Sequence, residues 1–134
     1  MAYVESSVVV YLRELYYPDG FLVEGAEVLS AVSPRLLRIE VGRELATLAM
    51  LATVSLLAAR NGWWERFAFF MWSFAAWDIF YYVWLYIVLR WPADLMALDV
   101  LFLVPRPWVA PVVLPVTVSG IMMASAAAIL RRTR

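Results

Sequence analysis

The chain contains no cysteine and no histidine among its 134 residues. The lack of cysteine excludes disulfides, redox thiols and thiolate metal sites. The lack of histidine excludes a haem with a histidine ligand, a histidine-containing zinc site, and a Ser-His or Cys-His nucleophile pair. No loop has the alternating aspartates of a calcium site. We therefore expect no metal, no cofactor and no catalytic residues of these classes.

Lysine is also missing, so all eleven basic residues are arginines, and eleven acidic residues balance them. A chain with zero net charge and no basic face is not expected to bind nucleic acid. Hydrophobic residues make up 65% of the chain and the mean hydropathy is +0.78, well above the values of soluble domains. The composition predicts an all-α integral membrane protein, a single membrane domain over residues 1–134, and a multi-pass location in a prokaryotic plasma membrane.

Three segments are long and apolar enough to cross a bilayer core, which needs about 20 helical residues. The first begins at Ser33-Pro34, because serine caps free N–H groups and proline suits the first helical position. Of the 21 aromatic residues, 14 lie between Trp63 and Trp91. Interfacial anchoring does not need so many. Packing against lipid and neighbours explains them, and a stacked surface for a flat ligand is the alternative. The predicted spans are residues 34–59, 67–89 and 108–130.

Two segments outside these spans also show helical features. Residues 1–33 form a predicted interfacial region, in which an amphipathic helix over residues 6–16 precedes a turn at Pro18-Asp19-Gly20. That helix either lies in the membrane interface or packs on the rest of the protein. Residues 95–104 as a helix would cover about 15 Å, half of the bilayer core, and predict a short interfacial or re-entrant helix. The next span should start irregularly, because Pro111 and Pro115 fall in its first two turns.

Asp78 lies in the middle of the second span, where the other ionisable groups are tyrosines. A central aspartate costs about 2.5–3.5 kcal/mol on insertion, so something must offset it. Three states remain open for this carboxyl group: it is neutral, it pairs with Arg43 or Arg106, or it faces a wet cavity. A structural role and a functional role are both consistent with this position.

Other charged residues are placed where they can meet Asp78. Glu40 and Glu44 share one helical stripe with Thr47 and Leu51. Arg106 stands between two prolines, which direct it towards Asp99 or a lipid phosphate, or leave it as a surface arginine at the headgroups. The predicted intramembrane polar site consists of Glu40, Arg43, Glu44, Asp78, Asp99 and Arg106.

The third span carries small residues at Gly120, Ala124 and Ala128, a spacing that permits close helix approach. With only three spans, we expect the chain to form a homo-oligomer or to join other membrane subunits within the lipid bilayer. The arginines flanking the spans are divided five against five between the two sides, so the positive-inside rule gives no orientation.

Three functions follow from these patterns. The favoured one is a non-catalytic subunit or assembly partner of a larger or oligomeric membrane complex, because the chain is small and lacks histidine and cysteine. The alternative is a small oligomeric transporter or channel that uses the intramembrane carboxylates for proton or cation passage. A membrane enzyme acting on lipid is the third, although the sequence offers no nucleophile with a matching base.

Overall fold

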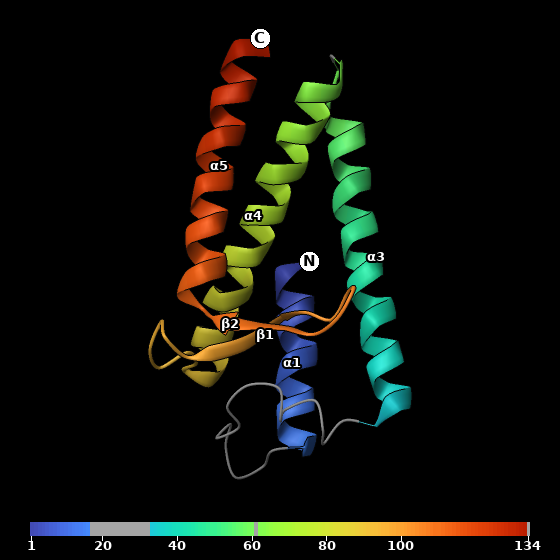
Figure 1. Ribbon diagram of the computed structural model, residues 1–134, viewed down its shortest axis with the longest axis vertical. Coiled ribbons are helices and arrows are strands. Elements are labelled where there is room, and N and C mark those ends of the chain that lie inside the picture. Colours follow the sequence, from blue (N-terminus) through green and yellow to red (C-terminus); the bar gives the residue numbers. More distant parts are fainter. Residues whose placement is uncertain (17–32, 61, 134) are drawn as a thin grey trace.

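The computed structural model describes residues 1–16, 33–60 and 62–133, so the turn predicted at Pro18-Asp19-Gly20 lies outside the described residues. Within these ranges the chain is mostly helical, with one pair of strands. Three of its helices are long and apolar enough to cross a membrane, which fits a multi-pass membrane protein. The elements in Figure 1 are α1 (Ala2–Tyr16), α3 (Pro34–Ala58), α4 (Gly62–Leu89), β1 (Leu98–Phe102), β2 (Trp108–Pro111) and α5 (Val113–Thr133).

The first two spans form where the sequence predicts them. Ser33 caps α3, because its hydroxyl oxygen accepts a hydrogen bond from the Leu36 N–H at 3.3 Å. The second span starts at Gly62, earlier than the predicted Phe67, and Gly62 has a φ of 68°, which glycine adopts readily. The short connection makes α3 and α4 antiparallel neighbours (Figure 1).

The predicted short helix over residues 95–104 is wrong, because this segment forms β1. It pairs antiparallel with β2, with Asp99 opposite Ala110 and Val100 opposite Val109. Periodicity alone does not distinguish a short apolar run in a strand from one in a helix. Here Pro105 and Pro107 lie in the connection and let the chain fold back, which supplies a hydrogen-bonding partner for the first strand.

The third span is consequently shorter than predicted. It starts at Val113, since Trp108–Pro111 belongs to β2. The irregular backbone expected at its start is the hairpin itself, and α5 then runs unbroken to Thr133. Pro115 lies in the first turn of α5. Backbone N–H groups in the first turn of a helix have no partner within that helix, so proline removes no helical hydrogen bond there.

The helix α1 packs on the rest of the described chain, which is one of the two placements that the sequence leaves open for it. It lies between α3 and α4 (Figure 1) and contacts α4, with the Tyr3 and Trp84 rings edge to face at 5.1 Å. Part of the apolar face points outwards, since Tyr11 and Leu15 are 65% and 75% exposed. Its buried positions include Ser6 and Arg13. The helix therefore turns polar as well as apolar side chains towards the rest of the chain.

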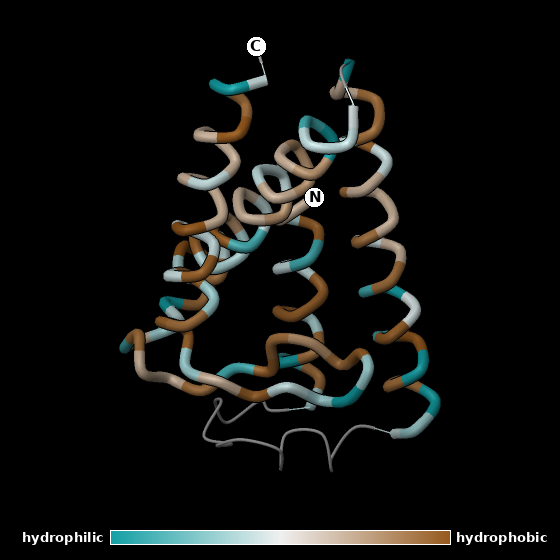
Figure 2. Tube along the Cα trace, turned by 45° about the horizontal axis from the view of Figure 1, so that its top comes forward, coloured by the Kyte–Doolittle hydropathy of each residue, from teal (hydrophilic) through white to brown (hydrophobic). Residues whose placement is uncertain are grey.

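Two apolar clusters hold α4 against the rest of the chain. Near the start of α4, Ala68 and Met71 pack against Ala126 of α5. Near its end, Tyr82 and Leu85 pack against Val112. Figure 2 shows hydrophobic positions along all three long helices, with hydrophilic positions interrupting them. Some of these hydrophilic residues are buried, including Glu40, Glu44 and Asp78.

Candidate functional site

A cavity of about 380 Å³ lies between α1, the first half of α3, the second half of α4, the hairpin and the start of α5. Each of these elements contributes both apolar and polar side chains to its wall. Arg106 does not line the cavity and is exposed in the turn between β1 and β2. The cavity does bring together the other five residues of the predicted polar site: Glu40, Arg43, Glu44, Asp78 and Asp99.

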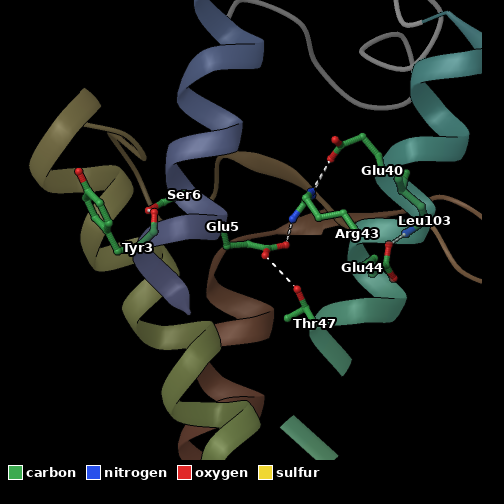
Figure 3. A network of polar contacts seen from close by, with 8 residues as sticks. All are labelled: Tyr3, Glu5, Ser6, Glu40, Arg43, Glu44, Thr47 and Leu103. Carbon is green, nitrogen blue, oxygen red and sulfur yellow. Dashed lines mark hydrogen bonds and ion pairs between the residues drawn. The ribbon is translucent and has the colours of Figure 1, made fainter. Parts of the chain in front are cut away.

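The α3 wall carries the polar stripe that the spacing predicts, since Glu40, Glu44, Thr47 and Leu51 are all buried. Its charges are linked to α1 (Figure 3). Arg43 donates hydrogen bonds to Glu40 at 2.9 and 2.6 Å and forms an ion pair with Glu5 of α1. The Thr47 hydroxyl donates a further hydrogen bond to Glu5 at 3.1 Å.

Glu44 joins α3 to the hairpin through one of its two carboxylate oxygens. The Leu103 backbone N–H donates to Glu44 Oε2 at 2.9 Å (Figure 3). The second oxygen, Oε1, is buried and has no hydrogen-bond partner, and the residue is only 9% exposed. Trp77 Nε1 is likewise buried without a partner, and Trp77 also lines the cavity. One acceptor and one donor on residues that line the cavity thus have no hydrogen-bond partner.

Asp78 lies on the cavity wall at the contact between α4 and α5. Its Oδ2 atom accepts a hydrogen bond from the Ser119 hydroxyl at 2.8 Å, and the residue is 8% exposed. The ion pairs found among residues 1–16, 33–60 and 62–133 do not include Asp78, because Arg43 is bound by two glutamates. Of the three states that the sequence left open, the ion pair with Arg43 or Arg106 does not form.

Asp99 meets groups from α1 and α4 rather than Arg106. The Tyr82 hydroxyl donates to Asp99 Oδ2 at 3.1 Å. Burial raises the pKa of Asp99 to about 6, and the nearby Arg13 charge and the Tyr82 hydrogen bond limit that rise. The Arg13 guanidinium itself lies over the ring of Trp91, 4.1 Å from its centre.

Sequence reasoning missed the contribution of α1 to the site. Glu5, Val9, Leu12, Arg13 and Tyr16 all line the cavity. They occupy positions i, i+4, i+7, i+8 and i+11, which place them on one helical face. That face pairs two charges with apolar residues, and its spacing was the available signal. Ser119 gave no comparable signal, because a single hydroxyl in an apolar helix is unremarkable.

The small-residue stripe of α5 lies on the outside of the described chain. Gly120, Ala124 and Ala128 are exposed, and a Cβ added at Gly120 would meet no atom within 4 Å. Within the chain, α5 faces α4 through the buried residues Ser119 and Ala126. The stripe is therefore exposed with respect to the part of the chain that the structure describes.

The site combines buried carboxylates, two arginines and aromatic rings around one cavity, and two of its polar atoms have no hydrogen-bond partner. Comparison with protein-family models, with curated proteins and with solved structures finds no match to this chain.

Proposed function

We propose that this protein is a small membrane transport protein that binds its solute in the cavity. The observation that supports this most is the pair of buried, unpartnered polar atoms beside the cavity, Glu44 Oε1 and Trp77 Nε1. A buried polar atom without a partner costs about 1–3 kcal/mol. A purely structural site would be expected to pair such atoms, whereas a binding site leaves polar groups for its ligand.

The position of the cavity favours a carrier over an open channel. The cavity lies in the half of the bundle that contains the hairpin. In the other half, Ala68, Met71 and Ala126 are in contact and are almost completely buried. A solute would therefore reach the second side only after α4 and α5, or α3 and α4, rearrange, as in alternating access.

The absence of native cysteine makes access to the cavity directly measurable. The variant Ser119→Cys places one thiol beside Asp78, with almost no change in side-chain volume. We expect a membrane-impermeant, cationic methanethiosulfonate reagent to label this thiol from either face of reconstituted vesicles. Labelling should be about tenfold faster than for the control Ala126→Cys, because Ala126 is fully buried away from the cavity.

Two results would contradict transport. Labelling from one face alone would show that the cavity never opens to the opposite side of the membrane, and the protein would then bind a solute without transporting it. If the Ser119→Cys thiol reacted from both faces as slowly as the Ala126→Cys control, the cavity would be closed to the reagent. Circular dichroism of each variant checks that the helices remain formed.

A second function, an assembly partner in an oligomer or larger complex, is supported by the outward stripe of α5. The variant Gly120→Leu fits the isolated chain, since a Cβ there meets no atom within 4 Å. If the stripe is an interface, this variant should weaken self-association in mild detergent about tenfold, because the added side chain holds the helices apart. Native mass spectrometry measures this effect.

The matched control is Gly42→Leu on α3, where an added Cβ likewise meets no atom within 4 Å. Both variants gain the same helix propensity, so only the interface distinguishes them. An unchanged distribution of masses in Gly120→Leu, or a wild-type chain that is already monomeric, would refute self-association through this stripe.

A further inference from the structure

We propose that the solute is an organic cation with an apolar body of aromatic size, held by the carboxylates and rings of the cavity. This inference rests on the proposed function, since it assumes that the cavity is a solute site. It adds the chemical class of the ligand, which the choice between transport and assembly does not fix.

The charges around the cavity favour a positive ligand. Five carboxylates line it against two guanidinium groups, which leaves an excess of three. Carboxylates removed from water must be neutralised, by protonation, by arginine or by a bound cation. The carboxylates are Glu5, Glu40, Glu44, Asp78 and Asp99, and the guanidinium groups belong to Arg13 and Arg43.

The two arginines are already engaged by the protein, so they do not make an anion site. Arg43 binds Glu5 and Glu40 at the same time. Arg13 lies over the Trp91 ring and close enough to Asp99 to limit the rise that burial causes in the pKa of that carboxyl group. A ligand anion would have to compete with these contacts and would also face the surplus of carboxylates.

Glu44 supplies the direct contact for a cation. Its Oε1 atom is buried, unpartnered and part of a residue that lines the cavity, while Oε2 is fixed by the Leu103 N–H. Fixing one oxygen holds the carboxylate in place. The other oxygen is then an acceptor without a donor, which a positively charged group would satisfy.

Aromatic rings supply the contact for an apolar body. Phe74, Trp77, Phe102 and Trp108 line the cavity. The Phe74 and Phe102 rings stack across α4 and β1 at 6.0 Å. The faces of such rings attract cations, and their apolar surface favours ligands that carry hydrocarbon. Together with the carboxylates, they describe a site for a cation whose charge is spread over, or attached to, an apolar group.

The size of the cavity argues against a bare metal ion. About 380 Å³ is far more than one ion occupies, and it falls in the range of small-molecule sites. Among the described residues there is no group of three His, Cys, Asp or Glu side chains placed to hold a metal. The carboxylates are distributed around the wall rather than gathered at one point.

Two probes of equal shape and opposite charge test the inference. Tetraphenylphosphonium and tetraphenylborate are measured by equilibrium dialysis against the full chain in mild detergent. We expect tetraphenylphosphonium to bind at least about tenfold more tightly than tetraphenylborate, after the uptake by empty micelles is subtracted. The variant Glu44→Gln should weaken the phosphonium about tenfold, while its amide oxygen still accepts the Leu103 hydrogen bond.

The control is Glu14→Gln on α1, which removes the same charge from an exposed residue outside the cavity. It should leave binding unchanged. If tetraphenylphosphonium and tetraphenylborate bound equally, or if Glu44→Gln and Glu14→Gln weakened binding equally, the cation inference would be overturned. Either result would still allow the cavity to bind a solute of another class. Absence of binding also overturns it. The transport proposal fails separately, if the Ser119→Cys thiol is sealed or is labelled from one face alone.

Discussion

Replacing Arg43 with methionine is expected to lower the free energy of unfolding by about 3 kcal/mol, because two buried carboxylates lose their counter-charge. Glu5 and Glu40 both bind this guanidinium, and their side chains are only 12% and 11% exposed. Methionine keeps most of the apolar stem, so lost packing contributes little. Reversible unfolding in mixed detergent micelles, followed by far-ultraviolet circular dichroism, measures the loss.

Arg38→Met provides the control, since Arg38 is exposed on the same helix, and it should change stability by less than about 0.5 kcal/mol. A double variant, Glu5→Gln with Arg43→Met, should recover part of the loss, because one unpaired charge is then removed. If Arg43→Met were no more harmful than Arg38→Met, Arg43 would not be what ties α1 to α3.

The second large effect is expected at the contact between α4 and α5. Ala126→Leu should destabilise the chain by about 3 kcal/mol, because a larger side chain forces the two helices apart. Ala126 and Ala68 are both 0% exposed and belong to one cluster with Met71. The same unfolding measurement applies.

A size exchange checks that reason. Adding Met71→Ala to Ala126→Leu makes room in the cluster for the leucine side chain. The double variant should therefore recover about half of the lost stability. The control Ala46→Leu makes the same change on an exposed position of α3 and should have little effect. A harmless Ala126→Leu, or a double variant that is no better than the single one, would show that α4 and α5 do not meet there.

Much of the helical architecture could be predicted, because the spans are long and their physical signals are strong. Ser33 marks the start of α3, and the stripe through Glu40 and Glu44 is buried as its spacing indicates. The strands were not predictable in the same way. A ten-residue apolar run forms a strand only when a partner is available, and that partner, Trp108–Pro111, was assigned to the next span.

The candidate site was predictable only in part, for a related reason. Charged residues in apolar helices stand out, which is why five cavity residues could be named in advance. Their partners depend on where α1 packs. Tyr11 and Leu15 of α1 face outwards while Arg13 is buried, so the usual rule that apolar residues mark the buried face misses Glu5 and Arg13.

The two-stranded hairpin also limits how the chain can be placed in a bilayer. Lipid-exposed sheet edges do not occur within the hydrocarbon layer, so in a bilayer the edges of β1 and β2 would lie at the headgroup boundary or against protein. The 21 residues of α5 follow almost directly and measure about 32 Å, close to the thickness of the hydrocarbon layer. Ser119 therefore lies about 9 Å along α5 from its hairpin end, and the Asp78 carboxylate bonded to it lies at the same level. A membrane that thins locally at this leaflet would bring that carboxylate close to water without any movement of the helices.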